Sequence, residues 1–290
     1  MIIVKLSDGL GNQMFQYAAG RRLAHHHNTD LFLDATGFAY NPLRKYELDV
    51  FRINATFAPL NLLKQVPISR KDAIRLSIRK LYARNTEFRY VKENGLDFHE
   101  EILSLPDNSY LAGYWQSENY FGEIADIIRK EFSFVNPPSL INQELMEKMM
   151  GCNSVSMHIR RGDYVSDPII MEIHGVLGTE YYKKALNVIE EHVKDPQIFV
   201  FSDEIPWAKD YIKTHLPLHF IDFNRAEKNY EDLRLMSHCK HHIIANSSFS
   251  WWGAWLSNKK NNVVIAPIKW FADKEMNTRQ TIVPDTWITI

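Results

Sequence analysis

The chain has 290 residues, of which 45% are hydrophobic, enough to bury the core of one large domain or of two domains of ordinary size. Its 34 basic and 35 acidic residues leave a formal net charge of -1. Binding to nucleic acid through a broad basic surface requires an excess of Lys and Arg, so this balance argues against a nucleic-acid partner. Any anion that the chain recognises is expected to be bound locally.

The N-terminal residues and the two cysteines indicate a cytoplasmic protein. The stretch MIIVKLSDGLGNQ soon turns polar and lacks the pattern of a secretion signal. No segment approaches the ~20 continuous apolar residues that a membrane-spanning helix needs. Cys152 and Cys239 lie far apart in the sequence and outside a CxxC pattern, as expected of thiols in a reducing compartment.

Apolar runs of strand length alternate with segments of helical period from the N-terminus onward, which predicts βαβ units and a parallel sheet. MIIVKL at 1–6 is predicted to be a strand, GNQMFQYAAGRRLAHHH at 11–27 a helix, and DLFLD at 30–34 the next strand. The apolar face of the helix consists of Met14, Phe15, Ala18, Ala19 and Leu23.

The second half of the chain shows the same alternation more regularly. Strands are predicted at 154–159, 197–201, 218–221, 241–245 and 262–267. Helical patterns begin near Thr179, Ile205, Tyr230 and Phe249. The predicted fold class is therefore α/β.

Two adjacent prolines separate the halves. Pro137 and Pro138 exclude a continuous helix, so a hinge is predicted at 136–139. The predicted domains are 1–136 and 137–290, each Rossmann-like, with a ligand cleft between them. No internal repeat or low-complexity segment suggests another architecture.

The stretch SMHIRRGDYV places two arginines, a histidine and an aspartate at the end of an apolar strand. His158 and Arg160 fall on the same face of that strand because side chains alternate. Gly162 lets the chain turn beyond the carboxyl end of the strand, where α/β proteins bind ligands. In one interpretation Arg160 binds a phosphate through two parallel hydrogen bonds. In the other, Arg161 pairs with Asp163 and Arg160 is solvated.

Two further stretches lie at helix starts, where backbone amides can bind an anion. GLGNQ separates the first strand from the first helix, and Gly9 and Gly11 can supply a tight turn there. Farther along, a strand ends at 246–248 and a helix follows from Phe249. The hydroxyl groups of Ser247 and Ser248 are either helix caps or part of an anion site. The tryptophans that follow, Trp251, Trp252 and Trp255, are predicted to pack in the core.

GLGNQMFQYAAGRRLA, HIRRGDY, FSDE and NSSFSWWGAWL, in this order and over nearly the full length, together resemble the α-1,2-fucosyltransferases of glycosyltransferase family 11. The resemblance implies a two-domain GT-B-like fold. It also implies inverting transfer of L-fucose from GDP-β-L-fucose to the 2-hydroxyl group of a galactose that ends a glycan. The N-terminal domain is then the acceptor side, and the C-terminal domain binds GDP-fucose.

The resemblance also assigns roles to particular residues. It implies that GDP contacts His158, Arg160, Asp232 and Ser248 with Phe249. The helix starts add Gly11, Asn12 and Ser247 as candidates for donor binding, and Asp203 in FSDE is a second candidate for reading guanine. Family members commonly have glycine at the position of Asp8, so the sequence does not assign Asp8 as the catalytic base.

The expected reaction chemistry agrees with these roles. Transfer from a nucleotide sugar builds negative charge on the leaving diphosphate, and a cationic group must stabilise it. The sequence has no DxD motif for a metal ion, so Arg160 is expected to act without a metal. His158 and Asp163 are both candidates for the catalytic base, although Asp163 is expected instead to orient Arg160 or Arg161.

Several questions stay open at the level of sequence. The identity of the acceptor glycan and the oligomeric state are not encoded in any motif. The basic helix predicted at 70–84 can pack on its own domain or lie on an anionic membrane as a peripheral contact. An alternative to the enzyme is a noncatalytic protein that binds nucleotide sugars or glycans with the same fold.

Overall fold

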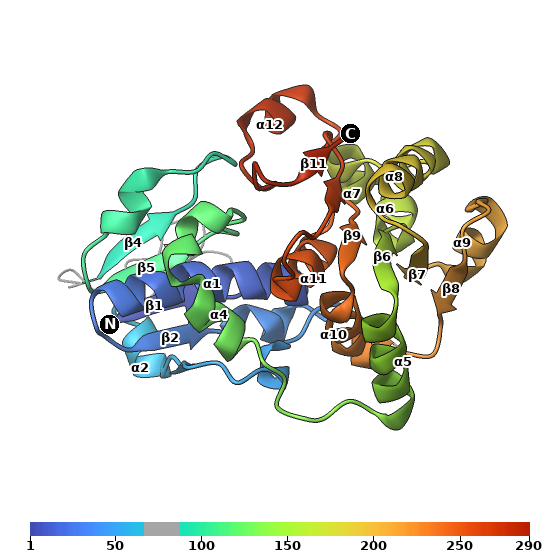
Figure 1. Ribbon diagram of the computed structural model, residues 1–290. Helices are drawn as coiled ribbons and strands as arrows, with labels where there is room; N and C mark the ends of the chain where they lie inside the picture. The colour runs from blue at the N-terminus through green and yellow to red at the C-terminus, as the bar shows by residue number, and fades with distance from the viewer. Residues whose placement is uncertain (67–87, 225) are drawn as a thin grey trace. The chain divides into compact units, whose positions relative to one another are not determined.

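The computed structural model describes residues 1–66, 88–224 and 226–290 and comprises two compact units, Met1–Val135 and Asn136–Ile290 (Figure 1). Each unit contains one parallel β-sheet. The basic helix predicted at 70–84 lies outside the described residues. Within the described ranges, no helix is both long and apolar enough to cross a membrane.

The N-terminal unit is built on a five-stranded sheet in which all neighbouring strands are parallel, with the order β3-β2-β1-β5-β4. Its strands are β1 (Ile2–Lys5), β2 (Leu31–Asp34), β3 (Thr56–Phe57), β4 (Arg89–Lys92) and β5 (Ser109–Ala112). Ile2, Ile3 and Val4 in the central strand are fully buried. Burial of both faces is typical of a parallel sheet covered by other elements on each side.

Helix α1 (Leu10–His26) packs against β1 and β2 (Figure 1). Gly20 makes this close packing possible, because a Cβ atom there would lie 2.1 Å from the side chain of Val4. The other helices in the described part of this unit are α2 (Leu60–Leu63) and α4 (Ala125–Glu131), with short 3-10 turns at Thr36–Tyr40, Leu48–Val50, Glu100–Ser104, Glu118–Tyr120 and Gly122–Ile124.

The C-terminal unit is built on a six-stranded parallel sheet with the order β11-β10-β9-β6-β7-β8. Its strands are β6 (Asn153–Ile159), β7 (Pro196–Ser202), β8 (Leu218–Ile221), β9 (His241–Ile243), β10 (Val264–Ala266) and β11 (Ile288–Thr289). The carboxyl ends of β6, β7 and β9 therefore lie side by side at one edge of this sheet.

Helices connect the strands of the C-terminal unit. They are α5 (Leu140–Gly151), α6 (Gly162–Ser166), α7 (Pro168–His174), α8 (Thr179–His192), α9 (Ile205–Tyr211), α10 (Asn229–His238), α11 (Ser248–Ser257) and α12 (Lys274–Arg279), with a 3-10 turn at Ala226–Lys228. Tyr182, Leu186 and Ile189 of α8 pack on Val155 and Met157 of β6 in the main apolar core.

The tryptophans of α11 belong to the core, as predicted. Trp251 and Trp252 are fully inaccessible to solvent and Trp255 is 5% exposed. The ring centroids of Trp251 and Trp252 lie 5.0 Å apart in an edge-to-face arrangement, and the indole N–H of Trp251 donates to the carbonyl of Ile282 at 2.7 Å. These contacts fix α11, and with it the serines at its start.

Candidate active site

Arg160 lies directly after β6, and its guanidinium bridges two carboxylates. Nη2 of Arg160 lies 2.6 Å from Oδ1 of Asp163, and Nη1 lies 2.9 Å from Oδ2 of Asp203. The guanidinium carbon also lies 5.4 Å from the centre of the Tyr164 ring. With partners on both terminal nitrogens, the guanidinium plane is held in one orientation at the carboxyl end of the sheet.

Arg161 has a different set of partners. Its Nε donates to Glu204 at 2.9 Å, and its guanidinium carbon lies 4.1 Å from the centre of the Trp207 ring. The interpretation in which Arg161 pairs with Asp163 and Arg160 is solvated is therefore wrong. The reason lies in the strand geometry, because neighbouring residues at a strand end point in opposite directions.

Asp203 links the ends of β6 and β7. Its Oδ1 accepts the backbone N–H of Arg161 at 2.9 Å, while Oδ2 pairs with Arg160. Burial raises the pKa of the Asp203 carboxyl, and the charge of Arg160 opposes that shift. Gly162 is required beside it, since a Cβ atom at residue 162 would lie 2.6 Å from Oδ2 of Asp203. The geometry gives Asp203 a positioning role.

His158 is buried near the end of β6 and is 6% exposed. Burial, together with the charge of Arg160, lowers the pKa of His158 to about 3. Its ring centroid lies 5.9 Å from that of Phe249, and its buried Nδ1 has no hydrogen-bond partner among the residues that the structure describes. A neutral imidazole with an unused nitrogen can contact a ligand, but a pKa this far below 7 makes it a weak base.

The start of α11 lies beyond the end of β9. Ser247 precedes the helix as its N-cap residue and makes no capping hydrogen bond with its side chain. The phenol of Tyr164 donates to the carbonyl of Asn246 at 3.0 Å, which ties the turn after β6 to this helix start. Backbone amides at the start of a ten-residue helix can bind an anion.

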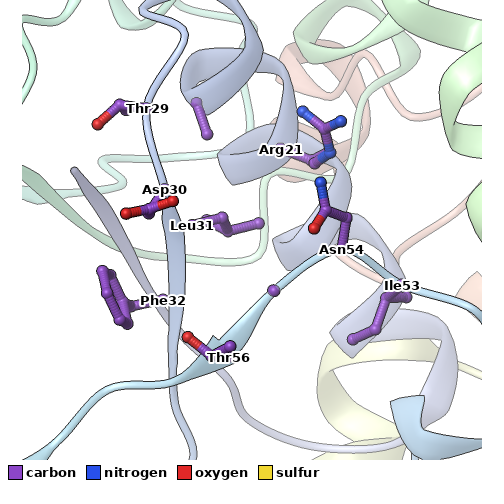
Figure 2. A pocket seen from close by; sticks show the side chains of 10 residues that line it. Arg21, Thr29, Asp30, Leu31, Phe32, Ile53, Asn54 and Thr56 are labelled. Carbon is purple, nitrogen blue, oxygen red and sulfur yellow. The ribbon is translucent and has the colours of Figure 1, made fainter.

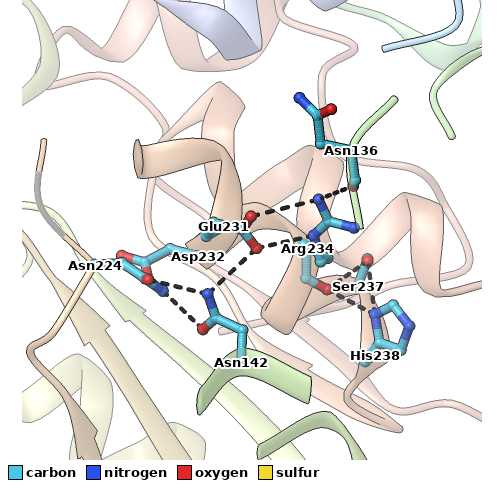
Figure 3. A network of polar contacts seen from close by, with 8 residues as sticks. All are labelled: Asn136, Asn142, Asn224, Glu231, Asp232, Arg234, Ser237 and His238. Atoms are coloured by element: carbon cyan, nitrogen blue, oxygen red, sulfur yellow. Dashed lines mark hydrogen bonds and ion pairs between the residues drawn. The ribbon is translucent and has the colours of Figure 1, made fainter. Parts of the chain in front are cut away.

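Asp232 belongs to a polar network between α10 and α5 (Figure 3). Its Oδ1 accepts a hydrogen bond from the amide of Asn224 at 2.8 Å, and Asn142 exchanges hydrogen bonds with Asn224 at 3.1 and 3.2 Å. Burial, reinforced by the charge of Glu231, raises the pKa of Asp232 to about 7 despite the bond from Asn224. Glu231 in turn pairs with Arg234 at 2.9 Å.

Gly11 and Asn12 lie in the N-terminal unit, in the first turn of α1. Oδ1 of Asn12 accepts a hydrogen bond from the side-chain amide of Gln116 at 2.6 Å. The tight turn was expected at Gly9 and Gly11, but the left-handed residue lies one position before Gly9. Gly9 has φ -79°, and the left-handed residue is Asp8 with φ 61°.

Two glutamines that the sequence analysis did not assign hold this loop. The side-chain amide of Gln13 donates to the carbonyl of Asp8 at 2.8 Å, and Gln16 accepts the backbone N–H of Ser7 at 2.9 Å. Both glutamines are fully buried. Neither glutamine belongs to the apolar face predicted for this helix, so the helical pattern alone did not single them out.

A cavity of roughly 360 Å³ opens elsewhere in the N-terminal unit (Figure 2). It is lined by residues before and at the start of β2 and β3, together with Arg21 of α1. Nε of Arg21 lies 3.0 Å from Glu131, so this cation is already paired. None of the predicted site residues lines this cavity.

The fold resembles that of the fucosyltransferase NodZ from Bradyrhizobium, with a TM-score of 0.51 over 87% of this chain and 90% of that chain. The sequence identity is 12%, so the likeness concerns the fold alone. A structure of NodZ alpha-1,6-fucosyltransferase soaked with GDP-fucose gives the same TM-score of 0.51. The two parallel α/β domains thus define a glycosyltransferase fold of the GT-B class.

The particular family follows from the sequence. Residues 1–290 match the family described as glycosyl transferase family 11, and the chain belongs to that family. It is 37% identical to an alpha-1,2-colitosyltransferase of Escherichia coli, over 100% of this chain and 99% of that protein. It is 34% identical to the O-antigen biosynthesis glycosyltransferase WbnK of Escherichia coli, over 98% and 99%. A galactoside 2-alpha-L-fucosyltransferase of Caenorhabditis elegans is 26% identical, over 99% and 78%.

Proposed function

We propose that the chain transfers L-fucose from GDP-β-L-fucose to the 2-hydroxyl group of a terminal galactose in a glycan, with inversion at the transferred carbon. Membership of family 11 and the relative named as a galactoside 2-alpha-L-fucosyltransferase support this proposal. The observation that carries it is the position of Arg160, fixed between two carboxylates at the carboxyl end of β6. A fixed guanidinium there can meet the leaving diphosphate without reorganising.

Arg160 does not act alone in this proposal. Asp163 and Asp203 place two carboxylates against its single positive charge, so the guanidinium supplies directed N–H donors but no net positive charge, and the diphosphate needs further donors. The first-turn amides of α11, with the hydroxyl groups of Ser247 and Ser248, supply them at the neighbouring strand end. His158 and Phe249 then flank the same part of the donor.

Asp232 is proposed to read the guanine base. Guanine presents donors at N1 and N2, and a carboxylate can accept from both, whereas adenine has an acceptor at N1. Asn224 holds one oxygen of Asp232 and so orients the carboxylate. Gly11 and Asn12 remain predicted donor contacts from the N-terminal unit.

The surroundings of His158 and Asp163 argue against both residues as the catalytic base. The low pKa of His158, about 3, makes it a poor proton acceptor near pH 7. Asp163 is engaged by Arg160 at 2.6 Å and is proposed to orient that arginine. No metal ion is required in this proposal, because the arginine and the helix start meet the charge on the diphosphate.

A second donor is favoured by one specific comparison, the alpha-1,2-colitosyltransferase at 37% identity. Colitose lacks the 3-hydroxyl group of fucose, so a site that hydrogen-bonds this group discriminates strongly between the two sugars. Equal concentrations of GDP-fucose and GDP-colitose should be offered to the enzyme with one galactoside. Preferential use of GDP-fucose supports the proposal, and preferential use of GDP-colitose replaces the donor sugar while leaving the reaction class unchanged.

A noncatalytic binding protein is distinguished by turnover. With GDP-fucose and a panel of galactosides, the enzyme releases GDP and forms a fucosylated product. A chain that binds GDP but does not cleave GDP-fucose or GDP-colitose would be a binding protein instead.

A further inference from the structure

A carboxylate and a tyrosine meet at the carboxyl edge of the N-terminal sheet, beside the loop that precedes α1. The phenol of Tyr114, just after β5, donates to Oδ2 of Asp8, just after β1, at 2.8 Å. The strands β1 and β5 are neighbours in the sheet. Ligands of α/β domains bind beyond the carboxyl ends of such strands.

Neighbouring side chains hold both partners in place. The carbonyl of Asp8, a residue with φ 61°, accepts from the buried amide of Gln13 at 2.8 Å. On the other side, Glu93 accepts the backbone N–H groups of Tyr114 and Trp115 at 2.5 and 2.9 Å. Trp115 is itself left-handed, with φ 56°. Holding two non-glycine residues in the left-handed backbone conformation costs free energy. Residues strained in this way are found more often at binding sites than elsewhere.

The pair nevertheless remains accessible. Tyr114 is 43% exposed although the neighbouring Trp115 is fully buried. Asp8 is partly exposed. Burial, together with the charge of Asp8, raises the pKa of the Tyr114 phenol, so Tyr114 stays a hydrogen-bond donor.

The chemistry of the pair selects a class of ligand. A carboxylate repels phosphates and other anions, and it accepts hydrogen bonds from neutral hydroxyl groups. An exposed aromatic ring packs against the C–H face of a sugar and excludes water from those bonds. A neutral carbohydrate fits this set of groups.

We propose that Asp8 and Tyr114 form the subsite for the terminal galactose of the acceptor, in which Tyr114 packs on the sugar ring and Asp8 accepts from a sugar hydroxyl group. This inference rests on the proposed function, because it names the residues that bind that reaction's acceptor. The contact lies within the N-terminal unit and requires no donor residue.

Direct binding tests the subsite separately from turnover. Methyl β-D-galactoside serves as the probe, and saturation-transfer NMR on the full chain measures its binding. The parent protein should bind the probe, Asp8→Asn and Tyr114→Ala should each weaken binding at least fivefold, and Tyr114→Phe should weaken it less because the ring remains. GDP affinity should be unchanged in all three variants.

Tyr110→Phe provides the matched control. It removes another phenol–carboxylate bond of the same unit, from Tyr110 to Asp34 at 2.6 Å, but that pair is buried. Probe binding should stay at the parent level in this variant. Absence of binding by the folded parent, or parent-like binding by Asp8→Asn and Tyr114→Ala, would overturn the subsite.

The kinetic arm separates this inference from the proposed function. If the chain transfers sugar, Asp8→Asn should raise the KM for the galactoside at least fivefold and leave the KM for the nucleotide sugar unchanged. Transfer by the parent with an unchanged galactoside KM in the variant rejects the subsite alone. Galactoside binding that depends on Asp8, without transfer from any GDP-sugar, rejects the proposed function alone.

Discussion

Arg160 and Asp203 come from neighbouring strand ends and form an ion pair of 2.9 Å between Nη1 and Oδ2. The same aspartate accepts the backbone N–H of Arg161, so one carboxylate fixes both the turn and the guanidinium that follows β6. The ion pair joins the HIRRG stretch to the FSDE stretch. It explains why the two motifs occur in one chain although they lie about 40 residues apart.

Replacement of Arg160 tests its proposed role at the diphosphate. Arg160→Lys should lose nearly as much activity as Arg160→Ala, because an ammonium cannot replace a planar fork held by two carboxylates. The expected loss in kcat is on the order of 100- to 1000-fold, or about 3 to 4 kcal/mol. Arg161→Lys is the control, and it should lose far less. Activity of Arg160→Ala within a few-fold of the parent contradicts the role.

Gly162 tests the geometry of the turn. In Gly162→Ala the new methyl group would lie 2.6 Å from Oδ2 of Asp203 and push that carboxylate away from Arg160. Transfer activity should fall by at least tenfold while the protein remains folded by circular dichroism. Gly151→Ala is the control in the same unit, since no atom lies within 4 Å of a Cβ atom there. Equal activity of the two variants is the outcome that rules out this packing.

The raised pKa of Asp232 predicts how GDP binding depends on pH. Guanine is expected to bind the carboxylate form, and a pKa of about 7 means that this form grows from a minority at pH 6 to a majority at pH 8. GDP affinity should therefore increase by up to about tenfold over that range. Isothermal titration of the parent and of Asp232→Asn isolates this effect from ionisation of the phosphate. An identical pH dependence in both proteins would place guanine elsewhere.

The same residue predicts a pH dependence of stability. Its folded pKa of about 7 lies above the ordinary value of 3.8, so the folded state binds more protons than the unfolded state between these values. The contribution of Asp232 to the free energy of unfolding is present below the ordinary pKa and is lost as pH rises toward 7. Asp232→Asn should flatten this decline in urea denaturation measured from pH 4 to pH 8. A decline as steep as in the parent contradicts the shifted pKa.

Removal of metal ions tests the mechanism. Since the arginine and the helix start are proposed to meet the charge on the diphosphate, transfer should proceed at the parent rate in excess EDTA. Added magnesium or manganese should change the rate little. Loss of activity in EDTA that is restored by one of these ions would require a metal-dependent mechanism.

Much of the C-terminal unit was predictable because its strands are apolar or alternating runs of strand length bounded by polar residues. The predicted strands at 154–159 and 197–201 correspond to β6 and β7, and helices α8 and α9 begin at the predicted Thr179 and Ile205. Such runs are buried on both faces, so sequence pattern and structure coincide.

The N-terminal unit was less predictable. Strands β4 and β5 were missed, because RYVK mixes charged and apolar residues and SYLA is only four residues long. These segments are strands because β5 pairs with β1 and β4 pairs with β5, and no local sequence pattern encodes this pairing. The contact between Tyr114 and Asp8 was invisible for the same reason, since it depends on β5 lying beside β1.

At the candidate site, motifs identified residues but not their partners. The sequence singled out Arg160, Asp163 and Asp203, yet it did not show that one guanidinium bridges both carboxylates. It named Asp232 but not Asn224, eight residues earlier, because no local pattern encodes a bond between these two side chains. The type of each residue can be read from the sequence, whereas its hydrogen-bond and ion-pair partners depend on the tertiary fold.

The most direct test of the central claim is product analysis by NMR after incubation of the enzyme with GDP-β-L-fucose and a β-galactoside. The parent should form an α-linked fucose on the 2-hydroxyl group of galactose, and Arg160→Ala should form at least 100-fold less of this product. A β-linked product, a linkage to another hydroxyl group, or undiminished product from Arg160→Ala would contradict it.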